Sequence, residues 1–167
     1  MDESKQPRYL LAATHAGEQH VPRLRKVLRS ELKPGQRSIH FKKEHPRRRR
    51  ELLSLYGRQG LNTTLFESNA RYDLEARFEC LEKLVRYALG SGVSRLVLER
   101  DDSVFKFDES SLYSLIRRQA RVKNLGFEHF YRHEEPLLWV PDSIAWCANQ
   151  GGEWARRIAD QSKTTAS

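Results

Sequence analysis

Short apolar segments alternate with longer amphipathic segments along most of this chain. In the second half, segments at 61–66, 95–99 and 127–131 carry β-branched and apolar residues, and those at 71–89 and 110–122 have apolar residues at helical spacing. Strands that alternate with helices of this length are typical of an α/β sheet with parallel strands. The alternation therefore predicts an α/β fold with helices on both faces of the sheet.

The first half predicts a different strand pairing. Strands are expected at 9–14 and 38–41, and helices at 21–32 and 44–56. The N-terminal strands are close enough in the chain to pair antiparallel, so the prediction is one mixed sheet in a single domain over 1–160. A last helix is expected to begin near Pro141, and the tail at 161–167 is expected to be disordered.

Composition excludes several classes of protein. No apolar run reaches the length of about 18 residues that a membrane span needs. The two cysteines, Cys80 and Cys147, do not form a C-x-x-C pair, which argues against a disulfide scaffold and a thiolate zinc site. Glycine-rich phosphate loops and G-x-S-x-G or H-E-x-x-H motifs are absent from the sequence. We therefore expect a cytoplasmic protein that does not use a membrane as its partner.

The basic charge lies in the first part of the chain. Residues 1–60 contain 15 Lys and Arg against 6 Asp and Glu, whereas residues 61–167 contain 15 against 16. This asymmetry predicts an anionic partner, RNA or DNA, because phosphate backbones bind clustered cations. A solvated helix face is the alternative. The residues expected to contact the backbone are Lys42, Lys43, Arg47, Arg48, Arg50 and Arg58.

Acidic residues cluster where catalytic sites form in α/β sheets. Glu99, Asp101 and Asp102 follow a predicted strand, and Asp142 begins the last helix. If they converge, such carboxylates can hold Mg²⁺ or Mn²⁺. A solvated loop for Asp101 and Asp102, and a dipole-stabilising helix acid for Asp142, are the alternatives. His40 adjoins the basic cluster, where an ordinary hydrogen-bonded histidine is the alternative.

Several motifs, in this order, resemble the domain-of-unknown-function 3800 family, which has a ribonuclease H-like fold. They are Asp2-Glu3-Ser4, the strand Tyr9 to Thr14, Ser38-Ile39-His40-Phe41, Leu96 to Glu99, and Leu137 to Trp146. The resemblance spans nearly the whole chain. In that family several apolar residues precede the Asp-Glu-Ser motif, whereas here only Met1 does. The expectation is a first strand that is shortened or that starts upstream.

The resemblance implies a metal-dependent nuclease site. Asp2, Glu99 and Asp142 would hold Mg²⁺ or Mn²⁺ and act in catalysis, with Asp101, Asp102 and Glu3 as further acids nearby. His40 would assist departure of the leaving group or product. Such ions activate a water that attacks a phosphodiester bond of RNA or DNA. Because only Met1 precedes Asp2, Asp2 is a conditional ligand.

Two other functions stay open from the sequence. One is a catalytically inactive nucleic-acid-binding protein of the same fold, as part of a ribonucleoprotein. The other is a protein-interaction module whose basic face meets an acidic partner, with Trp139 and Trp146 in the contact or in the core. A homo-oligomer is a further alternative.

Overall fold

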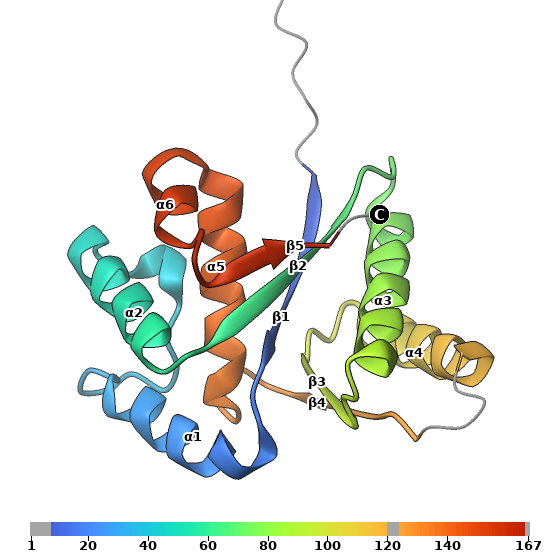
Figure 1. Cartoon of the computed structure of the whole chain (residues 1–167), viewed down its shortest axis with the longest axis horizontal. Helices are drawn as coiled ribbons and strands as arrows, with labels where there is room; N and C mark the ends of the chain where they lie inside the picture. Colours follow the sequence, from blue (N-terminus) through green and yellow to red (C-terminus); the bar gives the residue numbers. More distant parts are fainter. Residues whose placement is uncertain (1–7, 120–123, 166–167) are drawn as a thin grey trace, which may run out of the picture.

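Strands and helices alternate along the chain in the computed structural model, which describes residues 8–119 and 124–165 (Figure 1). The strands are β1 (Tyr9–His15), β2 (Asn62–Ser68), β3 (Arg95–Glu99), β4 (Gly126–Phe130) and β5 (Ser162–Thr164). The α-helices are α1 (Val21–Ser30), α2 (Pro46–Arg58), α3 (Asp73–Gly90), α4 (Phe105–Gln119), α5 (Trp139–Gln150) and α6 (Gly152–Arg157). Short 3₁₀ helices are η1 (Glu18–His20), η2 (Phe41–Lys43) and η3 (Pro136–Leu138). The α/β class that the sequence predicts is confirmed.

The described strands form two sheets. In the first, β1 pairs antiparallel with β2 from Tyr9 opposite Ser68 to His15 opposite Asn62, and β5 pairs parallel with β2. In the second, β3 and β4 pair parallel. The parallel pairing predicted for the second half is confirmed for β3 and β4. The antiparallel pairing predicted within the N-terminal part is wrong in its partner, because β1 pairs with β2 and not with 38–41, and the prediction of one mixed sheet is wrong for the described residues.

The segment 38–41 explains part of this difference, because it forms no strand. Ile39 and Phe41 are fully buried in the core beside α2 and α5, and the chain turns into η2 at Phe41. In the sequence, two apolar residues separated by one polar residue fit a strand as well as they fit a loop anchored in the core. Here they anchor a loop, so this segment adds no hydrogen-bonded partner to either sheet.

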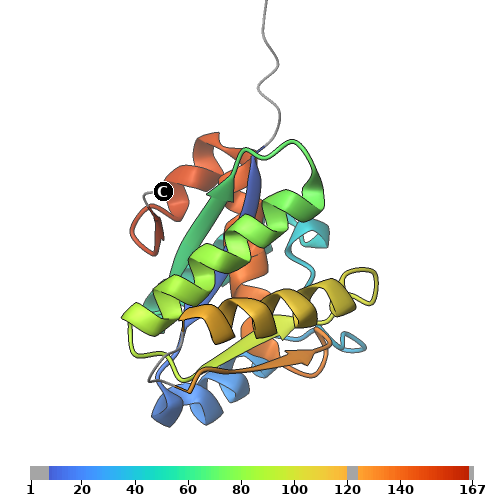
Figure 2. The same cartoon turned by 90° about the vertical axis from the view of Figure 1, so that its right-hand side faces the viewer.

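Helices cover both faces of the β1–β2 sheet, as expected. Successive residues of β2 point to opposite faces, so Leu65 enters the core under α1, α2 and α5, and Phe66 enters the core under α3 and α4. Figure 2 shows α3 crossing in front of β1 and β2, with α4 between α3 and the β3–β4 pair. None of the described helices combines the length and the apolar character needed to cross a membrane.

Both cysteines lie in these cores. Cys80 and Cys147 are buried, and burial raises the pKa of the Cys80 thiol to about 11 and that of the Cys147 thiol to about 12. Nucleophilic attack and metal binding need a thiolate, whereas these raised pKa values keep both thiols protonated at neutral pH. Cys80 and Cys147 therefore serve as core residues.

Two boundaries differ from the sequence predictions. α4 begins at Phe105 instead of Ser110, because the Asp101 carboxylate accepts hydrogen bonds from the backbone N–H and the hydroxyl of Ser103 and turns the chain into the helix earlier. The described part of the expected disordered tail forms β5. Its backbone pairs with the open edge of β2, and the Thr165 N–H donates to the Leu65 carbonyl at 3.1 Å.

A buried ion pair joins the helical layer to both sheets. The Arg77 guanidinium of α3 donates two hydrogen bonds of 2.5 Å to the Asp108 carboxylate of α4, and a third of 2.8 Å to the Tyr9 hydroxyl of β1. His129 of β4 lies beside the same carboxylate, with its Nε2 atom 3.8 Å from Asp108 Oδ2. Only 1% of the Asp108 side chain is exposed.

We predict that Asp108→Ala lowers the free energy of unfolding by about 3–5 kcal/mol, because it leaves the Arg77 charge buried without its partner. Urea unfolding followed by circular dichroism measures this change. Glu82→Ala is the control, because Glu82 and Arg86 form an exposed pair within one helix, and its loss costs less than about 1 kcal/mol. Equal effects of the two substitutions would contradict the role of the buried pair.

Candidate functional site

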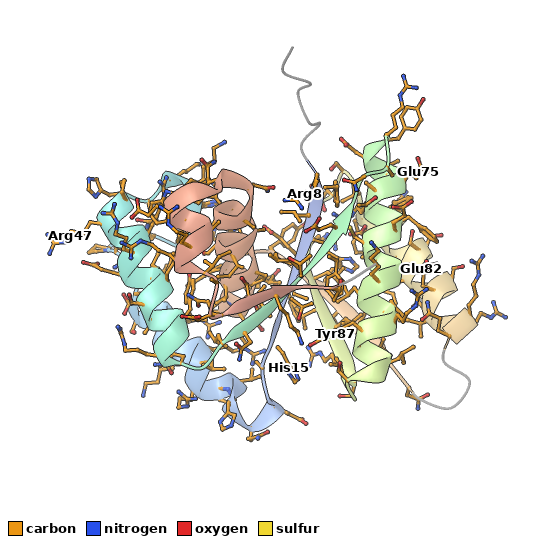
Figure 3. The ribbon with its side chains drawn as sticks, turned by 45° about the horizontal axis from the view of Figure 1, so that its top comes forward. Arg8, His15, Arg47, Glu75, Glu82 and Tyr87 are labelled. Atoms are coloured by element: carbon orange, nitrogen blue, oxygen red, sulfur yellow. The ribbon has the colours of Figure 1, made fainter. Side chains whose placement is uncertain are left out.

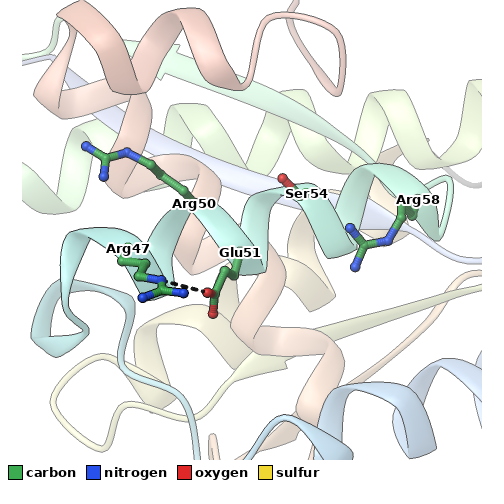
Figure 4. Close-up of a pocket in the computed structure, with 5 residues that line it drawn as sticks. All are labelled: Arg47, Arg50, Glu51, Ser54 and Arg58. Carbon is green, nitrogen blue, oxygen red and sulfur yellow. Dashed lines mark ion pairs between the residues drawn. The ribbon is translucent and has the colours of Figure 1, made fainter.

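The exposed side of α2 carries a row of arginines. Pro46 fits the first turn of a helix, His45 caps it by accepting the Arg47 N–H through Nδ1, and Leu52 and Tyr56 bury the opposite side. This geometry directs several charged residues to solvent. They line a shallow hollow, and Figure 4 shows them along the helix: Arg47, Arg50, Glu51, Ser54 and Arg58. We call this set the α2 basic face.

Acidic side chains neutralise part of the α2 basic face. Arg47 pairs with Glu51 at 3.4 Å, and Arg50 pairs with Glu153 of α6 at 3.0 Å. Arg58 forms no ion pair with any residue that the structure describes. Because the two pairs are exposed, they are weak and solvent-screened, so both guanidinium groups can exchange to another anion.

The two arginines between them are turned toward the protein. Arg48 pairs with Glu31 of the α1 C-terminus and is only 17% exposed. The Arg49 guanidinium donates to the Phe41 carbonyl at 2.9 Å and lies 4.3 Å from the centre of the Trp146 ring. The nucleic-acid contact predicted for Arg48 is therefore not part of the exposed surface. Lys42 and Lys43 of η2 are exposed next to the start of α2.

A second polar cluster forms around Arg132, in the turn after β4. Its Nε and Nη2 atoms donate to the two carboxylate oxygens of Glu99, at 3.0 and 3.3 Å. Its Nη1 atom lies 3.3 Å from Asp142 Oδ2 and 3.1 Å from His40 Nδ1. Three residues that the resemblance places in one site, Glu99, Asp142 and His40, thus meet at one guanidinium group. We call these four residues the Arg132 cluster.

Different elements position the members of the Arg132 cluster. Glu99 ends β3, and Asp142 lies in the first turn of α5, where a carboxylate is also favoured by the helix dipole. Arg132 follows β4, which pairs parallel with β3 so that Glu99 lies opposite Phe130. The indole N–H of Trp139 donates to the Arg132 carbonyl at 2.8 Å and fixes its backbone.

The electrostatics of the Arg132 cluster favour a charged arginine and a neutral histidine. Burial alone would lower the pKa of Arg132, but hydrogen bonds to Glu99 and the charge of Asp142 outweigh burial and raise it. Partial burial of the imidazole and the positive charges of Arg132 and Lys43 lower the pKa of His40, against the opposite effect of Asp142 and Glu99. Because a guanidinium can only donate, His40 Nδ1 accepts, and its proton resides on Nε2.

The other predicted acids do not join the Arg132 cluster. Asp101 faces Ser103, whose hydrogen bonds lower the pKa of its carboxyl group, and Asp102 pairs with Arg100 at 2.9 Å. Asp2 and Glu3 lie outside the described residues. Within 8–119 and 124–165, no three His, Cys, Asp or Glu side chains are grouped so that they could hold a metal ion.

Arg132 is also why the described residues do not fit a metal in their present arrangement. Glu99, Asp142 and His40 offer donor atoms that Mn²⁺ or Mg²⁺ accept. Those atoms all face the guanidinium instead, at 3.0 to 3.3 Å. In this arrangement the guanidinium occupies the position that a metal ion would need.

Arg132 is the member of this cluster that the sequence did not predict. It lies in no motif of the sequence. One signal was present: it follows a strand that runs parallel to 95–99, and the carboxyl ends of parallel strands meet at one edge.

We predict that the His40 imidazole titrates below pH 6.5 and that Arg132→Met raises its midpoint. Removing the guanidinium leaves the negative charges of Asp142 and Glu99 beside the ring, and these favour the protonated form. NMR titration of the imidazole protons measures both values. Arg58→Met, which removes the same charge from a residue that does not contact His40, is the control and leaves the midpoint in place. A midpoint that does not change in Arg132→Met would contradict the geometry.

No protein-family model, curated protein or solved structure matches this chain. The resemblance to the domain-of-unknown-function 3800 family therefore rests on the quoted motifs and their order, and stays a prediction.

Proposed function

We propose that this protein binds RNA or DNA through the α2 basic face, with Lys42 and Lys43 extending the contact. The observation that carries the proposal is the row Arg47, Arg50 and Arg58, which lines a solvent-exposed hollow along one helix. Guanidinium groups spaced along a helix suit successive phosphates of one backbone, because each can donate two hydrogen bonds to a phosphate.

The helix itself adds to the attraction for anions. The first turn of α2 contains arginines and no acidic residue, although basic side chains near a helix N-terminus oppose the helix dipole. The positive end of the dipole and these side chains therefore act together on an approaching phosphate. Figure 3 shows Arg47 pointing outward on the α2 side, whereas Glu75 and Glu82 lie on α3 across the sheet. Arg47 therefore lies away from these two acidic side chains.

Metal-dependent phosphodiester hydrolysis in a ribonuclease H-like fold is the second candidate. Two observations favour it: an antiparallel strand pair precedes a parallel pair in the chain, and Glu99, Asp142 and His40 meet in space. The position of Arg132 between the carboxylates weighs against it for the described residues. Binding without cleavage is therefore the function that we put first.

We predict that the triple variant Arg47→Gln, Arg50→Gln, Arg58→Gln weakens binding to a fluorescent single-stranded RNA and to duplex DNA. Each lost phosphate contact lowers the slope of log affinity against log salt by about 0.7 to 0.9, so three lost contacts lower it by about 2 to 3. Fluorescence anisotropy at several salt concentrations measures this slope.

The matched control removes three exposed arginines from the other side of the molecule: Arg71, Arg86 and Arg117, each replaced by Gln. It changes net charge by the same amount and leaves the α2 basic face intact. A loss of slope equal to that of the α2 triple variant would mean that net charge, not this face, determines binding. Wild-type protein without measurable affinity for either probe would refute the proposal.

A cleavage assay separates the two candidates. We predict that the wild type leaves single-stranded RNA, duplex DNA and an RNA–DNA hybrid intact in Mg²⁺ or Mn²⁺. Product detected on a denaturing gel, and abolished by both Glu99→Ala and Asp142→Ala, would instead establish the nuclease candidate.

A further inference from the structure

Arg132 differs from every other paired arginine in the described residues. It forms ion pairs with two carboxylates, Glu99 and Asp142, which come from separate elements. Arg25 and Arg77, the arginines of two other well-covered pairs, each hold a single carboxylate, Glu135 and Asp108. A cation that bridges two anionic groups has the same electrostatic role as a metal ion between two acidic ligands.

The guanidinium is well suited to that position. Its side chain is only 18% exposed, whereas Glu99 and Asp142 are 41% and 36% exposed. All three of its nitrogens are used, and Nη1, which has two N–H bonds, faces three acceptors: Asp142, His40 and the Ile39 carbonyl at 3.4 Å. The cation is therefore covered by protein, and its carboxylate partners form the outer side of the cluster.

The charges show what the arginine does. With Arg132 charged and His40 neutral, the cluster has a net charge of −1. The Glu99 and Asp142 oxygens and His40 Nδ1 that face inward all contact the guanidinium. Without Arg132 the net charge becomes −2, and two carboxylates and an imidazole face the same vacated space. Hard oxygen donors with one imidazole nitrogen form a ligand set that Mn²⁺ accepts.

We propose that Arg132 is a built-in cation that holds the place of a divalent metal between Glu99 and Asp142. The native cluster consequently does not bind a divalent ion, and removal of the guanidinium converts it into a metal site. The proposal does not rest on nucleic-acid binding, because none of its residues belongs to the α2 basic face.

The experiment is a Mn²⁺ titration followed by electron paramagnetic resonance, in which free Mn²⁺ gives the signal. Binding at the cluster is defined as the part that Glu99→Gln removes, so ions bound elsewhere do not count. Arg132→Met is expected to gain such binding, at least about tenfold tighter than any in the wild type. Arg132→Lys is expected to lie between the two, because lysine keeps the charge but lacks the fork that holds both carboxylates.

The matched control is Arg25→Met, which also uncovers a buried carboxylate but only one, and it is expected to gain no Mn²⁺ binding. A folded Arg132→Met variant that gains none, or an Arg132→Lys variant that gains as much as Arg132→Met, would overturn the proposal. If the Arg132 variants do not fold, the wild type and Glu99→Gln still decide: Mn²⁺ binding by the wild type that Glu99→Gln removes refutes the proposal, and its absence supports it.

Discussion

The hydrogen bonds of Arg132 join segments that the two sheets leave separate. β3 and β4 share no ladder with β1 and β2, yet Glu99 at the end of β3 and Asp142 at the start of α5 contact the same guanidinium. Because α5 packs on β1, this side chain attaches the second sheet to the layer that covers the first. On the opposite side, Arg77 and Asp108 make a similar connection. A buried guanidinium without a paired carboxylate destabilises the fold. Both Arg132 and Arg77 therefore need their carboxylate partners in place.

Charge is organised in two distinct ways in this molecule. In the Arg132 cluster, opposite charges meet at close range and largely cancel, which stabilises one arrangement of four chain segments. On the α2 basic face, exposed guanidinium groups are spaced along a helix and only weakly paired, so they can exchange to a phosphate backbone. The net charge of +8 therefore includes arginines with two different roles. Arg132 stabilises the fold, and we propose that the arginines of the α2 basic face bind nucleic acid.

Local patterns predicted much of the fold, and long-range contacts determined the rest. The apolar spacing of α3 and the β-branched segment of β2 specify a helix and a strand without reference to other residues. The pattern at Ile39 and Phe41 did not specify a structure, because alternating burial fits both a strand and an anchored loop. β5 could not be predicted from its own residues, because it forms only by pairing with the open edge of β2. In the site, Glu99 and His40 could be predicted as candidates from their residue types and positions. Arg132 lies in no motif, and only the parallel register of β3 and β4 brings it to Glu99.

The central claim is that a guanidinium, not a metal ion, lies between Glu99 and Asp142. A crystal structure of the wild type, grown in millimolar MnCl₂ with anomalous data collected above the manganese edge, tests it most directly. The account predicts Arg132 in contact with Glu99, Asp142 and His40, with no anomalous peak within bonding distance of those side chains. A manganese peak bonded to both carboxylates, with the Arg132 side chain displaced, would contradict it.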